Sequence, residues 1–393
     1  MSNRRSVALL IETSNAYARR LLDGIIAYQR EHELWSIYIG EQERGARPPA
    51  WMKNWRGDGI IARIETESIA SVVRRTKAPT VDVSAARRVP ELPWVETDDR
   101  AISRLAVQHL VDRGFRTLAY CGEPQFNWSR WREEEFLSCA ETAGCEHFIF
   151  QGKSRVEEGY SWTRERRRLK AWVERLPKPV GVMACYDFKG QQLLDVCREL
   201  DVPVPERVAV IGVDNDARFC RLCTPPLSSV IPDTHRAGYE AAKLLDRMMR
   251  GEPVKAEPLL VPPLGIADRQ STDVFAIDDP DVVAVLRYIR QHACERITVA
   301  DLLRVAPLSR RMLEQRFLKL LRRTPHAEIT RIRMDRAGRL LRETTLSLQE
   351  IAQRVGYGDP LYLSRAFKKY TGVAPRAYRR DGRGANGKSP WEK

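Results

Sequence analysis

The sequence predicts a two-lobed α/β domain of doubly wound parallel sheets, followed by an all-α domain with two helix-turn-helix units. Short apolar strands alternate with amphipathic helices over residues 5–265. About ten such strands are more than one open sheet usually carries, which favours two lobes with a cleft between them. From Pro280 onward the apolar residues recur only at helical spacing, so no strand is expected there.

The predicted elements of the α/β part follow one another in a regular order. Residues 16–32 are predicted to form an amphipathic helix, and residues 99–113 a helix that ends at Gly114, a residue type favoured just after a helix. Strands buried on both faces and separated by such helices indicate parallel sheets. Strands are predicted at residues 7–11, 35–39, 59–64, 80–83, 117–121, 148–150, 181–185 and 208–213.

Composition divides the chain into four segments. Residues 1–266 are predicted to be the two-lobed domain, and residues 267–280, which are polar and lack periodicity, a linker. Residues 281–380 are predicted to be the helical domain. The last residues, 381–393, are expected to be a disordered tail because they are rich in glycine and polar side chains.

The positive charge is confined to the C-terminal part. The chain has a net charge of +14, and residues 280–393 hold 25 Lys and Arg against 11 Asp and Glu. Residues 1–279 hold 41 of each and are neutral. Because the basic residues are spread over a predicted folded domain, we expect that domain to bind a polyanion.

Residues 298–317 predict the first helix-turn-helix unit. Thr298 can cap a short helix that Pro307 ends, and Ser309 can cap a second helix. Polar side chains on the outward face of this second helix can reach base edges in a major groove. The expected inward residues are Met312 or Leu313, Phe317 and Leu320, and the expected base-contacting residues are Arg311, Glu314 and Gln315.

The same plan returns about fifty residues later. Ser347 and Glu350 form a capping box, Gly356 lies in the turn, and residues 359–370 are the second candidate recognition helix. A long helix over residues 325–343 can hold the two reading helices about 34 Å apart, one turn of B-DNA. On the second helix the expected inward residues are Leu363, Phe367 and Tyr370, and the expected base-contacting residues are Leu361, Tyr362 and Arg365. Phosphate contacts are expected from Arg310, Arg322, Arg323, Lys368 and Lys369.

Three stretches of the basic domain resemble the AraC family DNA-binding domain. They run from Ile351 to Tyr357, from Phe367 to Gly372 and from Pro375 to Arg379, and the resemblance covers residues 281–379. It implies double-stranded operator DNA as a partner and base contacts at the six positions named above. Leu361 and Tyr362 stand where polar residues are common in the family, so the operator sequence stays open.

The neutral part resembles the core of LacI-type regulators, which is related to periplasmic sugar-binding proteins. The resemblance rests on Asp98 before a helix, Arg132 four residues before Phe136, and the run from Val210 to Asn215. A guanidinium and a carboxylate facing a cleft suit a polyhydroxy ligand, and a tryptophan can stack on a sugar face. The expected ligand-binding residues are Asn15, Asp98, Trp128, Trp131, Arg132 and Asp214.

A LacI-like core followed by an AraC-type domain resembles the xylose operon regulator family over nearly the whole length. This resemblance implies D-xylose as effector and activation of xylose catabolism genes. The segment from Gly122 to Trp131 departs from that family by being shorter, so a different pentose or hexose stays open. Further matching stretches are residues 204–208, 241–245, 260–263, 269–273 and 288–294.

Other classes of protein fit the sequence less well. The short apolar run near the N-terminus is too short for a signal peptide core or a membrane span, so a cytoplasmic protein is expected rather than a transport-type sugar-binding protein. No phosphate-binding glycine loop, Ser-His-Asp motif or metal-ligand cluster indicates an enzyme, and Cys220 and Cys223 lack a second pair. We expect no cofactor, no metal and no membrane partner, and a homodimer that meets RNA polymerase.

Overall fold

A computed structural model describes residues 4–32, 34–43, 45–154, 157–274, 279–295, 297–321 and 323–381. The chain divides into two compact units. The first unit comprises Met1–Gln108 and Arg116–Asp273, and the second, called the helical unit below, comprises His109–Phe115 and Val274–Lys393. Within the described residues no helix is both long and apolar enough to cross a membrane.

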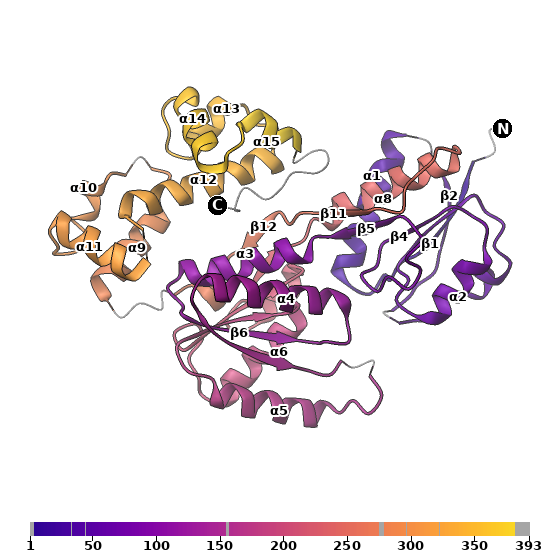
Figure 1. The fold of residues 1–393 in the computed structure, drawn as a ribbon, viewed down its shortest axis with the longest axis horizontal. Coiled ribbons are helices and arrows are strands. Elements are labelled where there is room, and N and C mark those ends of the chain that lie inside the picture. Colours follow the sequence, from indigo (N-terminus) through magenta and orange to yellow (C-terminus); the bar gives the residue numbers. More distant parts are fainter. Residues whose placement is uncertain are drawn as a thin grey trace. The chain divides into compact units, whose positions relative to one another are not determined.

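The first unit contains two α/β lobes (Figure 1). In the first lobe six parallel strands lie in the order β11-β5-β4-β3-β1-β2. Alternate residues of β1 face opposite sides, so Val7 and Leu9 pack toward α1 and α8 while Ala8 and Leu10 pack toward α2. The elements are β1 (Ser6–Leu10), α1 (Ala16–Glu31), β2 (Ser36–Ile39), η1 (Ala50–Asn54), β3 (Gly59–Ala62), α2 (Glu67–Arg75), β4 (Thr80–Asp82), β5 (Trp94–Thr97), α8 (Thr234–Met249) and β11 (Pro258–Val261).

Helices α1 and α8 pack closely because each has a glycine at the contact. A Cβ atom added at Gly24 would lie 1.9 Å from the carbonyl oxygen of His235, and one added at Gly238 would lie 1.9 Å from that of Leu21. No side chain fits such a space, so both positions require glycine. This contact joins the first helix of the lobe to a helix that returns more than two hundred residues later.

The second lobe repeats the architecture. Its strand order is β12-β10-β9-β8-β6-β7, with β12 antiparallel to β10 and the other pairs parallel. Figure 1 shows α3 and α4 along one side of this sheet and α5 and α6 along the other. The elements are α3 (Asp99–Asp112), β6 (Thr117–Gly122), α4 (Asn127–Thr142), β7 (Glu146–Gln151), α5 (Trp162–Arg175), β8 (Val180–Ala184), α6 (Asp187–Glu199), β9 (Val208–Val213), α7 (Ala217–Leu222), β10 (Ser228–Ile231), β12 (Gly265–Ala267) and η2 (Gln270–Thr272).

The chain crosses between the lobes three times. It passes from β5 to α3, from β10 back to α8, and from β11 to β12. Parallel strands present their carboxyl ends at one edge of each sheet, where open α/β folds bind ligands. The crossing after β5 begins at this edge, because Asp98 and Asp99 follow the end of the strand directly.

The helical unit consists of two small cores joined by a long helix. Ile329 of α12 packs in the first core, whereas Met334, Ala337 and Leu341 of the same helix pack in the second. The helices are α9 (Pro280–His292), α10 (Val299–Leu302), α11 (Arg310–Leu321), α12 (Pro325–Glu343), α13 (Leu348–Arg354), α14 (Pro360–Thr371) and α15 (Pro375–Asp381). Among the described residues from Pro280 onward there is no strand, as predicted.

The structure corrects the predicted start of the linker. Residues 267–280 were expected to lie outside the folded lobes, but Ala267 belongs to β12 and the first unit extends to Asp273. Ser271 and Thr272 have no exposed surface. Their hydroxyl groups are hydrogen-bonded into the second lobe, which a polar composition alone does not reveal. The predicted tail lies outside the described residues from position 382 onward.

Candidate functional site

A cavity of about 30 Å³ lies at the carboxyl ends of the strands, lined by residues of both lobes of the first unit. Of the six predicted ligand residues it brings together three, Trp128, Arg132 and Asp214. The other lining residues are Tyr17, Arg63, Glu96, Thr97, Asp99 and Tyr186.

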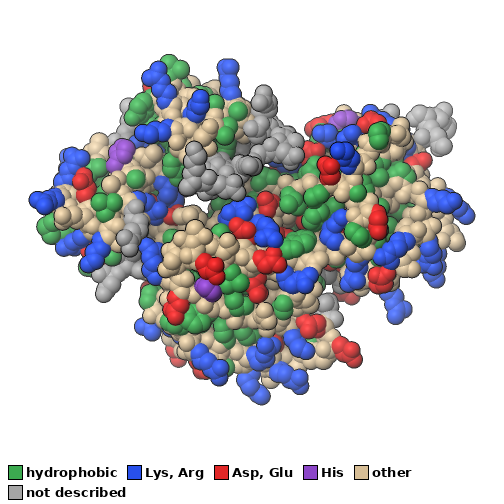
Figure 2. Space-filling view, in the orientation of Figure 1, with side chains coloured by type: hydrophobic (Ala, Val, Ile, Leu, Met, Phe, Trp, Pro, Cys, Tyr) green, Lys and Arg blue, Asp and Glu red, His purple; other side chains and the backbone are tan. Residues whose placement is uncertain are grey.

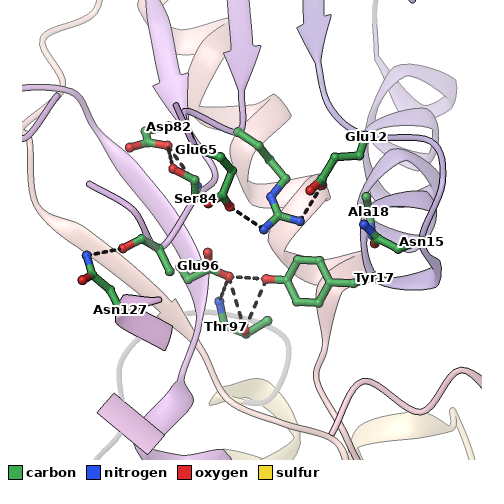
Figure 3. A network of polar contacts seen from close by, with 12 residues as sticks. Glu12, Asn15, Tyr17, Ala18, Glu65, Asp82, Ser84, Glu96, Thr97 and Asn127 are labelled. Carbon is green, nitrogen blue, oxygen red and sulfur yellow. Dashed lines mark hydrogen bonds and ion pairs between the residues drawn. The ribbon is translucent and has the colours of Figure 1, made fainter. Parts of the chain in front are cut away.

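A buried ion-pair network supports the first-lobe side of this cavity (Figure 3). The guanidinium of Arg63 donates to Glu12 and to Glu65, each across 2.7 Å, and lies over the ring of Tyr17, 5.1 Å from its centroid. Burial opposes the charged form of Arg63, but the two glutamates outweigh it and raise its pKa. The hydroxyl of Tyr17 donates to Glu96, which closes the network.

The second-lobe side is centred on Arg132. Its Nε donates to Oδ1 of Asp99 across 2.7 Å, and its guanidinium lies over the ring of Trp128 at 5.1 Å. Burial raises the pKa of Asp99 to about 7, although the charge of Arg132 acts in the opposite direction. Both side chains of the pair are at most 4% exposed, so their charges are little screened by solvent.

Two buried polar atoms of cavity-lining residues have no hydrogen-bond partner among the described residues. They are Oδ2 of Asp99, an acceptor, and Nε of Arg63, a donor. An unpartnered buried polar atom is costly, commonly about 1–3 kcal/mol. A ligand that carries several hydroxyl groups can both donate and accept, so it can satisfy both kinds of atom.

Asp214 lies on a strained turn that follows β9. Asp214 and Asn215 have φ angles of 105° and 47°, in the region that favours glycine. Each such residue costs on the order of 1–3 kcal/mol. Asp187 offsets this cost by accepting hydrogen bonds from the backbone amide of Asp216 at 2.9 Å and from Ser229 at 2.6 Å. The turn is therefore fixed by buried partners with Asp214 at the cavity.

The remaining three predicted ligand residues are not among those lining the cavity. Asn15 caps α1, because its Oδ1 accepts from the amide of Ala18 at 2.8 Å (Figure 3). Asp98 caps α3 in the same manner, accepting from Ala101 at 2.9 Å. Trp131 packs against Trp94, with ring centroids 5.8 Å apart. These side chains already have structural partners, and the cavity-lining carboxylate is the next residue, Asp99.

Several lining residues were missed from the sequence although a positional signal exists for them. Arg63 directly follows β3, and Glu96 and Thr97 end β5. Polar residues at the carboxyl ends of parallel strands are candidates for ligand contact by position alone. Tyr17 and Tyr186 have no comparable signal, since an aromatic residue near a helix N-terminus is equally common in cores.

A second, larger hollow of about 400 Å³ lies in the second lobe near Gly152, Ser161 and Arg164. Arg164, at its edge, is exposed, and Lys153 and Arg168 have side chains about half exposed. The smaller cavity is the better ligand site, because its charged groups are buried and preorganised. Among the described charged residues that line the larger hollow only Glu165 is buried, and solvent screens the basic side chains of Lys153, Arg164 and Arg168.

The second candidate surface is formed by α11 and α14. The two helices show the same order of buried and exposed positions over residues 311–320 and 361–370. Leu313 and Phe317 are buried in one helix, as are Leu363 and Phe367 in the other, whereas Met312 is 44% exposed. Of the predicted base-contacting residues, Arg311, Gln315, Leu361, Tyr362 and Arg365 are exposed, and Glu314 is partly exposed.

Both helix-turn-helix segments have the predicted N-terminal caps, which confirms where α10 and α13 begin, but α10 ends at Leu302, earlier than the predicted end at Pro307. Thr298 with Asp301 and Ser347 with Glu350 form capping boxes at the start of α10 and α13. On the face drawn in Figure 2, the helical unit shows many Lys and Arg side chains and few acidic ones. This distribution matches the confinement of the net charge to residues 280–393.

The predicted phosphate-contacting residues differ in their surroundings. Lys368 and Lys369 are exposed, and the Arg310 side chain is 70% exposed beside Glu314. Arg323 instead pairs with Glu328 at 2.7 Å and with Asp112 at 2.9 Å, and its side chain is only 21% exposed. The phosphate assignment of Arg323 is therefore disfavoured. Arg322 lies outside the described residues.

Comparison with known proteins covers both candidate surfaces. Three family models match successive parts of the chain: the XylR N-terminal domain over residues 6–100, the periplasmic binding protein-like domain over residues 107–272, and a helix-turn-helix domain over residues 302–381. The last two models separate the sensor-like lobes from the helical unit, as the structure does. These matches confirm the predicted fold class.

Curated relatives and a solved structure match nearly the whole chain. The xylose operon regulatory protein of Escherichia coli (strain K12) is 33% identical over 386 residues, which is 96% of this chain and 97% of the relative. That of Haemophilus influenzae is 31% identical over 381 residues, 95% and 97% of the two chains. The structure of the xylose-binding transcription activator xylR has a TM-score of 0.63 and 32% identity, covering 96% of this chain and 98% of that one. The chain therefore belongs to the family of xylose operon regulatory proteins, transcription regulators that join a periplasmic-binding-protein-like sensor to a C-terminal helix-turn-helix domain.

Proposed function

We propose that this protein is a cytoplasmic regulator that binds D-xylose in the cavity of the first unit and operator DNA through α11 and α14, and that it activates genes of xylose catabolism. The observation that carries the proposal is the pairing of Arg132 with Asp99 at 2.7 Å in a cavity that also holds unpartnered Arg63 Nε and Asp99 Oδ2. Guanidinium and carboxylate groups fixed side by side recognise adjacent hydroxyl groups of a sugar.

The charge of the cavity supports a neutral ligand. Two arginines, Arg63 and Arg132, line it together with three carboxyl groups, those of Glu96, Asp99 and Asp214. A phosphate or carboxylate on the ligand would meet no excess of positive charge, so an unphosphorylated sugar is favoured over a sugar phosphate or a sugar acid. Trp128 and Tyr186 offer aromatic surface for the apolar face of a sugar ring.

The choice of D-xylose rests on relatives that carry xylose in their names and match the full length of the chain. The serious alternative is a sensor of a different pentose or of a hexose. The segment from Gly122 to Trp131, which the sequence predicts to be shorter than in the family, runs from the end of β6 to the start of α4 and supplies Trp128 to the cavity. A change there would alter the ring size or the hydroxyl pattern that the cavity accepts.

The decisive experiment is a titration of the full-length protein with D-xylose, L-arabinose, D-ribose, D-glucose and D-xylose 5-phosphate, followed by tryptophan fluorescence and calorimetry. Saturable binding of D-xylose, with at least tenfold weaker binding of the others, supports the proposal. Preferential binding of another sugar supports the alternative, and binding of the phosphate ester alone would contradict both.

DNA binding is the proposed output. Exposed side chains of α11 and α14 read bases in two successive major grooves, and exposed Arg310, Lys368 and Lys369 contact phosphates. Gel-shift titrations on upstream DNA of xylose catabolism genes, with and without D-xylose, measure this output. Equal affinity for the upstream DNA and for unrelated DNA would overturn sequence-specific binding.

Two protein partners belong to the same proposal. We propose that the regulator works as a homodimer, because two copies double the number of recognition helices on direct repeats, and that it contacts RNA polymerase at the promoter. Light scattering of the protein alone and with operator DNA measures the first. Transcription in vitro with purified polymerase measures the second, and a fall in transcript on adding D-xylose would contradict activation.

A further inference from the structure

The last segment of the first unit is anchored in the second lobe before the chain enters the linker. Ser271 donates to the carbonyl of Val210 at 2.6 Å and accepts from the amide of Ser228 at 2.8 Å. Ser228 also donates to the carbonyl of Arg269 at 2.9 Å. Residues 268–273, called the exit segment here, therefore move with β9 and β10, and the chain continues from them to the helical unit.

Arg269 reaches from the exit segment to the turn that carries Asp214. Its Nη2 donates to Oδ1 of Asn215 across 2.7 Å, and its Nη1 donates to the carbonyl of Leu227 across 2.8 Å. Asn215 is 9% exposed and adjoins Asp214, which lines the ligand cavity. One side chain thus joins the exit segment to the cavity wall.

The same turn touches the opposite lobe. Arg20 of α1 donates to the backbone carbonyl of Asn215 at 3.4 Å, and the amide of Asn215 donates to Ser229 at 3.0 Å. The turn holds two successive residues at positive φ, so its shape depends on these supports. A ligand that binds Asp214, or a movement of the first lobe that displaces Arg20, would therefore shift Asn215, the residue to which Arg269 is hydrogen-bonded.

We propose that Arg269 is a positioning residue that transmits sugar occupancy from the Asp214–Asn215 turn to the exit segment, and so to the orientation of the DNA-binding unit. This inference rests on the proposed function, because it needs a sugar at Asp214 and DNA at the helical unit. It assigns Arg269 no contact with the sugar. Coupling of two sites requires an element whose arrangement both sites affect, and the turn with its arginine is such an element.

Substituting Arg269 tests whether the effect of sugar on operator affinity can be lost while sugar binding and operator binding are each retained. In full-length Arg269→Gln we expect the D-xylose Kd to change by less than about threefold, and the operator Kd without sugar to change as little. The sugar-induced change in operator affinity should fall at least tenfold or vanish. Arg218→Gln is the matched control, since Arg218 is exposed on α7 in the same lobe, and it should keep the full sugar response.

Two substitutions at Asn215, which accepts the hydrogen bond of Arg269, keep the test valid if Arg269→Gln does not fold. Asn215→Asp retains an acceptor for Arg269 and tolerates positive φ, so it should keep the sugar response. Asn215→Gly also tolerates positive φ but removes the acceptor, so it should lose the response. A parallel loss of thermal stability and of both affinities in Arg269→Gln and Asn215→Gly would assign these residues a structural role only and would overturn the proposal.

Measurements on the wild-type protein distinguish a failure of the proposed function from a failure of coupling through Arg269. If wild type responds to D-xylose and Arg269→Gln responds equally, coupling through Arg269 is wrong while the proposed function stands. If wild type binds neither sugar nor operator, the proposed function fails, and the coupling through Arg269 fails with it.

Discussion

The Arg132 guanidinium donates to the carboxylate of Asp99 across 2.7 Å and thereby joins α4 to the first residue of α3 at the wall of the ligand cavity. The pair is buried, and a second oxygen of Asp99 has no hydrogen-bond partner among the described residues. Arg132 therefore holds Asp99 in place at the cavity, and under the proposed function it also contacts the sugar.

Arg132→Lys should weaken sugar binding without unfolding the lobe. Lysine keeps a positive charge beside Asp99 but cannot donate two fixed hydrogen bonds in one plane. The loss of one charge-assisted hydrogen bond is about 1.5–3 kcal/mol, so the D-xylose Kd should rise roughly 10- to 150-fold. Calorimetric titration measures this change, and the melting temperature without sugar is the control for the fold. An unchanged Kd would exclude Arg132 from the site.

Asn15 should prove dispensable for the ligand. Its side chain caps α1, so Asn15→Ser, which preserves a capping oxygen, should leave both stability and the sugar Kd close to wild type. Asn15→Ala should lower the free energy of unfolding by about 1 kcal/mol. Urea unfolding and sugar titration of the two variants measure these effects. If Asn15→Ser weakened sugar binding tenfold while stability held, the amide would be a ligand contact after all.

Sequence patterns predicted the architecture well because burial is periodic. The alternation of strands and helices, the cap at Thr298 and the capping box of Ser347 and Glu350 all appear in the structure, since each depends on residues close together in the chain. The linker boundary was less predictable, because the hydroxyls of Ser271 and Thr272 find partners that lie some forty to sixty residues away. A polar residue buried by such partners looks like a linker residue in the sequence.

The candidate ligand site was harder to predict from the sequence than the fold. Arg132 and Asp214, two of the predicted ligand residues, line the cavity, whereas the predicted Asp98 does not and its neighbour Asp99 does. Two adjacent acids at a helix N-terminus take different roles, one as the cap and the next facing inward, and that choice depends on the helix phase relative to the cavity. The place of Arg63 at the cavity depends on its ion pairs with Glu12, which follows β1, and with Glu65, which follows β3. Because the pair with Glu12 forms only when the two strands lie side by side, the sequence alone does not reveal it.

Exposed residues of the recognition helices should divide into two kinds by their effect on DNA. Arg311→Ala, or Arg365→Ala on the other helix, should weaken operator binding by about 1–3 kcal/mol and relax specificity at one base pair. Lys369→Ala should weaken operator and unrelated DNA alike and lower the slope of log K against log salt by about one. Gel-shift titrations at several salt concentrations measure both properties.

A matched control for the DNA variants is Arg304→Ala. The Arg304 side chain is 81% exposed and follows α10 rather than lying on a recognition helix, so its removal should change specificity little. If Arg304→Ala and Arg311→Ala had the same effect on operator and unrelated DNA, α11 would not read bases.

Asp82 should make the stability of the first lobe depend on pH. Burial raises its pKa to about 7 from the ordinary 3.8, because only Ser84 and the more distant Arg87 stabilise the carboxylate. The folded protein therefore holds a proton that the unfolded chain releases between about pH 4 and pH 7, and the free energy of unfolding falls as the pH rises through that window. Asp82→Asn keeps an acceptor for Ser84 but cannot ionise. The free energy of unfolding of this variant should match that of wild type near pH 4.5 and exceed it at pH 8 by on the order of 2–4 kcal/mol.

Urea unfolding followed by tryptophan fluorescence at both pH values measures the difference in free energy of unfolding between wild type and Asp82→Asn. Comparing the two proteins isolates Asp82 from other buried acids such as Asp187. A difference that stays constant with pH would mean that Asp82 is ionised throughout in the folded lobe.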